Sequence, residues 1–443
     1  DTDRFVPVAT VGATVCKVGA TKRWNGNWLN WATTSRMDAL RRVLYGGYRA
    51  ADPASGITEL QGAYIPNDSH VWGKEFRPGR DTYDITEYTT LSTPTAGKQH
   101  LFVVKSPSVA TGTYPFLVPS NAPNLRYIEN ADMVTERIWL WASADVAQGI
   151  GANSADFSKG GGRSGVASTA RRIRVEACVP LGIPAVREAG CVGYPASVPV
   201  VWKPTGVLHD YAANNDALKF GLVTGSYQNN YSGGVLRRNI TSFNDEINPA
   251  NGTFATNDVV AGTVDGIART IDRISIQGWS SSGTIYDCGY KTDGTRAQGA
   301  CKSWGAPVAE MMYEGLRNFS GKASATSAYA TGVGIGGSAD TIMGFSAPPA
   351  WLNPYRAPAD GGSPICSRPV QMVIADPLTS FDSDQLPGAF FSPAGGFGTA
   401  LGSNDLAGLN VSTEADAIWT AEALGTRNVY IGQVGAAYDG NPT

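Results

Sequence analysis

The part of the chain that most constrains the fold is residues 24–47, which read WNGNWLNWATTSRMDALRRVLYGG. Polar residues such as Arg36 and Asp38 separate apolar residues that recur at helical spacing: Leu29, Met37, Leu40 and Leu44. Gly46-Gly47 follow, a pair that favours the end of a helix. Three tryptophans within eight residues give this segment a heavy aromatic load. The pattern predicts an amphipathic helix that ends at the glycine pair.

The composition is that of a weakly charged, loop-rich protein. The 443 residues suffice for two or three domains, and 53 glycines and 26 prolines predict many turns. Only 16% of the residues are charged, which is common in secreted β-rich proteins, and the net charge is -3. No long run of like charge indicates a nucleic acid or an anionic membrane surface as partner.

No apolar stretch approaches the roughly 20 residues that a membrane span requires. The chain begins at Asp1 without a signal peptide, and it ends at Thr443 without a terminal cap. We therefore expect a mature or fragmentary piece of a longer secreted precursor.

Cysteine usage indicates an oxidising compartment. Two cysteine pairs, Cys178/Cys191 and Cys288/Cys301, each enclose a short loop, and a disulfide would stabilise such a loop by about 3 kcal/mol. Cys16 and Cys366 would then close a very long loop, although other connectivities and six buried thiols remain open. Without a C-x-x-C pair, and with only three histidines, the sequence does not favour a zinc site.

The segment 48–205 predicts an insertion of irregular β structure in a core formed by residues 1–47 and 206–443. Its β-branched and aromatic residues favour strands at 137–143 and 171–178, and the Gly/Ser-rich stretch 154–168 favours a loop.

From residue 204 onward, helical and strand patterns alternate. The predicted helices are 204–214, 307–319 and 412–424; the predicted strands are 218–224, 272–277, 370–375 and 427–432; and 321–364 is expected to be a long loop. Alternation of this kind predicts a parallel sheet covered by helices on both faces, an α/β fold.

The order of these elements resembles a von Willebrand factor A domain, a doubly wound fold that often binds a metal ion at the carboxyl ends of its strands. No D-x-S-x-S motif precedes Trp24, although the first strand could lie upstream of Asp1, and the turn at 305–307 lacks the usual threonine. Asp376 follows a predicted buried strand and is the one residue of the usual set that remains. The resemblance implies at most a remnant site for Mg²⁺ or Ca²⁺ there.

Other candidate sites are weaker. Asp382 and Asp384 are two nearby carboxylates, but prolines occupy the glycine and glutamate positions of an EF-hand, so a solvated turn is favoured. The glycine motif at 332–337 lacks a preceding strand, and the isolated histidines His70, His100 and His209 favour structural roles. No recognisable nucleophile or metalloenzyme motif occurs, so we expect no enzymatic activity.

Residues 26–47 also carry a family resemblance. They are similar to a run in the PilC/PilY family, large secreted proteins of bacterial type IV pili. Further matches follow in the same order at residues 63–75, 203–208, 218–227, 232–239, 304–316 and 381–388. The family usually continues into a C-terminal β-propeller with a calcium loop, which is absent from this chain.

The resemblance implies an extracellular protein at the pilus tip, exported through the periplasm. It would prime pilus assembly with minor pilins and would bind a host-cell or surface receptor, with strand addition to a sheet edge as one mode of contact. A secreted polysaccharide hydrolase and a structural filament or sheath subunit are the alternatives.

Overall fold

The computed structural model consists of two compact units, which are described separately. Unit 1 comprises residues 1–215, 247–254 and 279–285, and unit 2 comprises residues 216–246, 255–278 and 286–443. The structure describes residues 4–10, 17–18, 21–65, 73–105, 122–138, 169–182, 184–213, 216, 218–227, 229–255, 265–275, 305–326, 329, 343–375, 379, 382, 385–388, 406, 408–424, 433–434 and 438–439.

The segment 24–47 forms two helices instead of the predicted one, α1 (Gly26–Thr33) and α2 (Arg36–Tyr45). Ser35 separates them, because its side chain accepts a hydrogen bond from the Asp38 N–H while the Asp38 carboxylate accepts one from the Ser35 N–H. The predicted end is confirmed: Gly46 adopts a left-handed conformation with φ 95° and caps α2.

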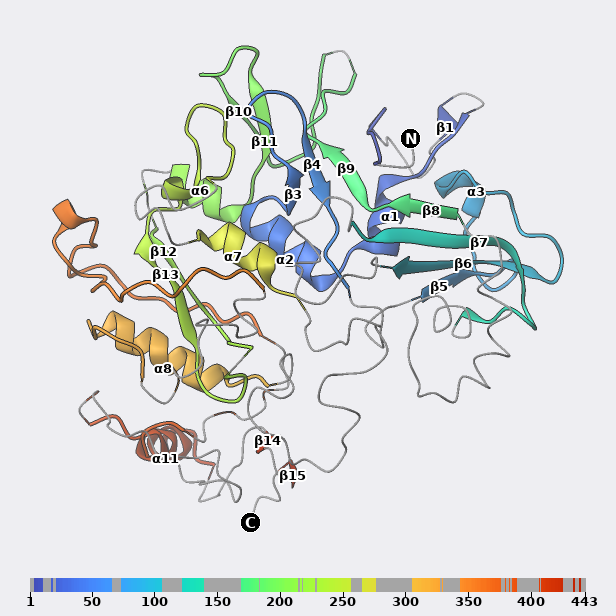
Figure 1. Ribbon diagram of the computed structural model, residues 1–443. Coiled ribbons are helices and arrows are strands. Elements are labelled where there is room, and N and C mark those ends of the chain that lie inside the picture. Colours follow the sequence, from blue (N-terminus) through green and yellow to red (C-terminus); the bar gives the residue numbers. More distant parts are fainter. Residues whose placement is uncertain are drawn as a thin grey trace. The chain divides into compact units, whose positions relative to one another are not determined.

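The main sheet of unit 1 is antiparallel, with the order β5-β6-β7-β8 (Figure 1). Its strands are β5 (Gly73–Phe76), β6 (Lys98–Lys105), β7 (Asn124–Asp132) and β8 (Thr169–Arg172). Trp28 of α1 packs edge-on against Phe102 of β6 at a centroid distance of 4.9 Å. The tryptophan-rich helix therefore lies on a sheet made by residues 73–172, which belong to the predicted insertion and not to the core predicted from residues 1–47 and 206–443.

Smaller elements complete unit 1. The predicted strand 171–178 is found as the end of β8 and as β9. The sheet β3-β4-β9 and the hairpins β1-β2 and β10-β11 are also antiparallel. The bounds are β1 (Lys17–Val18), β2 (Thr21–Lys22), β3 (Arg49–Ala51), β4 (Thr58–Gln61), α3 (Ile85–Tyr88), β9 (Arg174–Ala177), β10 (Cys191–Tyr194), β11 (Val201–Pro204) and α6 (Val207–Ala213).

Unit 2 is built around the antiparallel hairpin β12-β13 and the helix α8. Its elements are β12 (Phe220–Thr224), β13 (Val235–Thr241), η2 (Phe243–Glu246), α7 (Ile267–Arg273), α8 (Val308–Phe319), η3 (Pro358–Asp360), α11 (Val411–Ala421), β14 (Gln433–Val434) and β15 (Tyr438–Asp439). The predicted helices at 307–319 and 412–424 and the strand at 218–224 are confirmed within a few residues.

The structure is mixed α/β, but the doubly wound parallel sheet is not found. All named strands in the described part of the chain pair antiparallel. The predicted strand at 272–277 is wrong at its start, since Asp272 and Arg273 end helix α7. The predicted buried strand 370–375 is also wrong, because these six residues are exposed and belong to no sheet.

Several predictions cannot be compared. The strand at 427–432 and the loop at 154–168 lie outside the described residues, as does nearly all of the strand at 137–143. The predicted domain boundaries at 47/48 and 205/206 stay predictions. Among the helices that the structure describes, none combines the length and apolar character of a membrane span.

Candidate functional site: a disulfide-bonded loop beside a buried charge cluster

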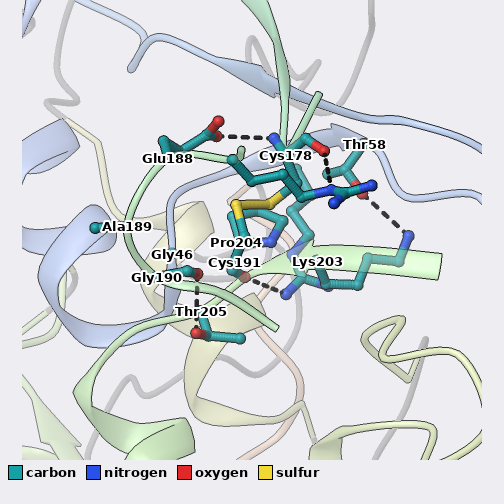
Figure 2. Close-up of a disulfide and its surroundings, with 12 residues drawn as sticks. Gly46, Thr58, Cys178, Glu188, Ala189, Gly190, Cys191, Lys203, Pro204 and Thr205 are labelled. Carbon is teal, nitrogen blue, oxygen red and sulfur yellow. Dashed lines mark hydrogen bonds between the residues drawn. A yellow bond between two sulfur atoms is a disulfide. The ribbon is translucent and has the colours of Figure 1, made fainter. Parts of the chain in front are cut away.

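The best-defined polar region of unit 1 surrounds a disulfide between Cys178 and Cys191, the partners that the short loop predicted (Figure 2). Cys178 follows β9 and Cys191 begins β10, and their Cα atoms lie 5.7 Å apart. Glu188 accepts a hydrogen bond of 2.8 Å from the Cys178 N–H, and the Arg187 Nε donates to the Cys178 carbonyl. The loop is thus held by its own side chains as well as by the disulfide.

The disulfide-bonded loop is attached to the end of α2. Arg42 donates to the Ala189 carbonyl at 2.9 Å, and Thr205 donates to the Gly190 carbonyl through both its N–H and its hydroxyl. At Gly46, a Cβ would lie 2.5 Å from the carbonyl oxygen of Pro204. Only glycine allows the two backbones to approach so closely at this positive φ.

A fully buried lysine lies next to this loop. The Lys203 ammonium donates to the Asp52 carboxylate at 2.7 Å, to the Pro53 carbonyl at 2.7 Å and to the Thr58 hydroxyl at 3.0 Å. These three bonds use all of its donors. Burial lowers the pKa of Lys203, and the hydrogen bond to Asp52 opposes this shift.

Arg49 extends the cluster to a distant part of the sequence. Its guanidinium pairs with Asp52 at 3.0 Å, donates to the Gly252 carbonyl at 2.7 Å and lies 4.0 Å from the ring centroid of Phe254. Burial, together with the Arg49 charge, lowers the pKa of His209 to about 3. The cluster therefore fixes residues 247–254 to the rest of unit 1.

This arrangement binds chain segments together and presents no activated nucleophile. The Cys178, Glu188 and Cys191 ligand atoms lie within 4.8 Å of one another, a spacing that suits a metal ion. Because both sulfurs belong to the disulfide, neither is a thiolate ligand in this state. The disulfide and the charge cluster therefore have a structural role: they connect segments of unit 1.

Two family models match the chain. The model described as "PilY1 homolog, small alpha/beta domain" matches residues 1–116, and "PilY1 homolog, second domain" matches residues 220–443. This chain belongs to the PilY1 homolog family. The expected resemblance to pilus proteins of the PilC/PilY type is thereby confirmed.

A curated relative from Xylella fastidiosa (strain Temecula1 / ATCC 700964), "Type IV pilus biogenesis factor PilY1 homolog", is 38% identical over 435 residues. The alignment covers 96% of this chain but only 28% of the relative, so the chain spans less than a third of that protein. No solved structure matches the chain.

The predicted metal residues are only partly described in this PilY1 homolog. Asp376 and Asp384 lie outside the described residues. Asp382 is buried, and its carboxylate accepts a hydrogen bond of 2.6 Å from the Ala309 N–H in the first turn of α8. This contact gives Asp382 a capping role, and its metal role stays a prediction.

The other predicted residues divide in the same way. Cys366 is exposed and has a free thiol, so its predicted disulfide with Cys16 is not found. Cys288 and Cys301 lie outside the described residues, and their pairing stays a prediction. His70 and the glycine motif at 332–337 are likewise not described.

Both described histidines are buried inside unit 1. His100 Nδ1 accepts a hydrogen bond from the Asn130 N–H, and its Nε2 lies 2.7 Å from the Ser92 carbonyl oxygen. His209 packs beside the Phe254 ring, with 5.8 Å between the ring centroids. These surroundings agree with the structural roles that the sequence favoured.

Proposed function

We propose that this chain is part of an exported, non-enzymatic type IV pilus biogenesis factor that acts at the pilus tip. In this proposal it primes assembly together with minor pilins, and it contacts a surface or a host-cell receptor. The observation that carries the proposal is the 38% identity to a type IV pilus biogenesis factor across 96% of the chain.

The chemistry of unit 1 supports an extracellular location. The Cys178–Cys191 disulfide requires an oxidising compartment such as the periplasm or the cell exterior. Beside this disulfide, the Lys203–Asp52 ion pair joins two further segments of unit 1.

Two finer features belong to the same proposal. A von Willebrand A-like sheet would form in the context of the longer protein, and a divalent cation (Mg²⁺ or Ca²⁺) would bind at the remnant site that includes Asp376. An experimental structure of a longer chain, solved with the cation present, tests both features.

The decisive experiment for the function is deletion of the gene in its own bacterium, with complementation by an epitope-tagged copy. We expect few or no surface pili in the deletion strain, and a single gold label at one filament end in the complemented strain. Normal piliation in the deletion strain contradicts the proposal. A continuous coat of label supports a sheath subunit instead, and glycan cleavage by the purified chain supports a hydrolase.

A further inference from the structure

Helix α8 of unit 2 distributes its side chains against the usual rule. Glu310 and Glu314 have exposed fractions of 0%, whereas Met312 and Leu316 are 43% and 41% exposed. Glu314 accepts hydrogen bonds from Thr326 and Arg317, and Glu310 Oε1 accepts one from the Gln385 N–H. An amphipathic helix normally turns its apolar stripe toward a packed layer, and here Met312 and Leu316 of that stripe face solvent.

A second apolar segment lies against the same stripe. In α8, a Cβ at Gly315 would lie 2.8 Å from the side-chain oxygen of Gln371, so the two elements are in close contact. Gln371 belongs to residues 370–375, which read VQMVIA and follow Pro369. These six residues form neither a helix nor a strand (Figure 1, orange trace). Three side chains of this segment are strongly exposed: Val370 at 78%, Met372 at 72% and Ile374 at 57%.

The backbone of residues 370–375 is exposed, like its side chains. No backbone hydrogen bond joins these six residues to any other described residue. The segment has no charge and no internal proline, the usual devices that protect a strand edge from pairing. Water hydrates these exposed N–H and C=O groups, and an extended chain could replace that water by pairing with them.

The exposed apolar patch, formed by residues 370–375 with Met312 and Leu316, is too small to favour a second copy of this chain as its binding partner. A stable protein interface takes about 20–30 residues a side. Six residues with the side chains of Met312 and Leu316 fall well short of that number. Peptide recognition by strand addition, in contrast, needs only one edge of this length.

The charge of Arg368 indicates which kind of residue lies at one end of a chain that pairs with residues 370–375. Arg368 precedes the segment by two residues, is exposed, and forms no ion pair with the described residues. An acidic group on the incoming chain would lie against it, next to an otherwise uncharged, β-branched sequence.

We propose that residues 370–375 are an acceptor for an extended apolar strand donated by another protein subunit, with an acidic residue of that strand placed against Arg368. The donated strand satisfies the backbone of 370–375, and its side chains cover Met312 and Leu316 of α8. This inference rests on the proposed function, because assembly with pilus subunits would supply such a strand.

The test uses the complete 443-residue chain and a synthetic probe, a blocked eight-residue peptide of alternating valine and threonine that ends in aspartate. We expect saturable binding by fluorescence anisotropy and slower amide hydrogen exchange at residues 370–375. A peptide with the same side chains but alternate N-methylated amides should bind at least about tenfold more weakly, a difference of about 1.4 kcal/mol. Equal binding of the two peptides, or unchanged exchange, overturns the acceptor.

Variants locate the site. Met372→Pro removes an N–H from an exposed position and should weaken binding at least about tenfold, while Ile365→Pro, a matched exposed change outside the acceptor, should leave it unchanged. Arg368→Glu should weaken binding about two- to fivefold, and a lysine in place of the peptide aspartate should restore it. Protection of 370–375 in a self-associated dimer without peptide overturns the proposal in favour of a second copy.

Failure of this inference is distinguishable from failure of the proposed function. If the probe does not bind while the deletion strain lacks pili, the acceptor is wrong and the pilus function stands. If binding depends on residues 370–375 while the deletion strain is normally piliated, the acceptor stands and the pilus function is wrong.

Discussion

Units 1 and 2 differ in the kind of side chain that their helices α1 and α8 bury. In unit 1, apolar side chains of α1 and the sheet are almost completely buried, with Trp28 at 6% exposure, Phe102 at 2% and Leu125 at 0%. In unit 2, the same burial is reached by charged side chains of α8, while apolar residues of α8 and of 370–375 face solvent. Helix α1 of unit 1 therefore packs on an apolar core, whereas unit 2 combines buried apolar residues such as Tyr231 and Phe243 with exposed apolar side chains on α8 and at 370–375.

Unit 2 also buries charged groups beside its buried apolar residues. Glu246 accepts hydrogen bonds from the N–H groups of Ile267 and Ala268 at the start of α7, and Asp265 pairs with Arg269 and Arg273. Such contacts are directional, and breaking one partner leaves an unpaired buried charge. The exposed apolar side chains of α8 and of 370–375 are of the kind that marks an interaction site.

The largest effect is expected in the core of unit 1. Trp28→Ala should lower the free energy of unfolding by about 5 kcal/mol, because it empties the centre of an aromatic cluster. Trp31→Ala is the matched control: Trp31 is 51% exposed and contacts Lys74 through a cation–π interaction, so about 1 kcal/mol is expected. Urea titration measures both, and equal losses would show that unit 1 lacks the apolar core described here.

Next in size is the buried pair of unit 1. Lys203→Met should cost about 3–4 kcal/mol, because the Asp52 carboxylate, which is only 16% exposed, loses one of its cationic partners. The control is Lys98→Met, which removes an ion pair with Asp132 whose side chains are 37% and 36% exposed, and should cost less than about 1 kcal/mol. A loss at Lys203 no larger than that at Lys98 would mean that the cluster does not stabilise unit 1.

The disulfide should have a slightly smaller effect. Replacing both Cys178 and Cys191 by serine should lower the stability of unit 1 by about 3 kcal/mol, because the loop then gains freedom in the unfolded chain. Cys366→Ser removes an exposed free thiol and should leave the stability of unit 2 unchanged. Hydrogen exchange, followed separately in α2 and α8, distinguishes the units, and a loss confined to α8 would contradict this assignment.

Local patterns in the sequence were enough for several elements of both units. The end of α2 at Gly46 and the helix α8 follow from residue spacing, since capping and helical periodicity act over a few residues. The apolar run at 370–375 has the same local signal as a buried strand. Whether it is buried depends on a neighbouring strand, and no local pattern reports that neighbour.

Of the candidate site in unit 1, the disulfide was predicted from the sequence and the buried charge cluster was not, because local patterns do not report long-range contacts. The spacing of Cys178 and Cys191 pointed to their disulfide, because a short loop favours closure. Asp52 and Lys203 are 151 positions apart, and although Lys203 begins the family match at 203–208, nothing in that match points to Asp52. Their pairing arises from the packing of β11 beside β4, a long-range contact that sequence spacing does not encode.

The smallest effects concern the pH dependence of stability. One buried titratable group changes the free energy of unfolding by at most about 1.4 kcal/mol per pH unit, and the sign of this change differs between the two units. Burial raises the pKa of Glu246 in unit 2 to about 7 from 4.5, so the folded unit keeps a proton that the unfolded chain releases. The stability contributed by Glu246 is present below pH 4.5 and is lost as the pH rises to 7. Burial lowers the pKa of His209 in unit 1 to about 3 from 6.5, so its contribution is lost as the pH falls from 6.5 to 3.

Between pH 4.5 and 6.5, acidification should therefore stabilise unit 2 through Glu246 and destabilise unit 1 through His209. Hydrogen exchange in α7 and α6 follows the two units in one experiment, and Glu246→Gln and His209→Gln each remove one titration. Because other groups titrate in the same range, the informative quantity is the difference in pH slope between wild type and variant. If Glu246→Gln leaves the slope of unit 2 unchanged, its carboxyl is ionised throughout this range. The buried Glu246 would then be an ionised carboxylate that is stabilised by its partners. The difference between the units would consist only of the exposed apolar side chains of unit 2.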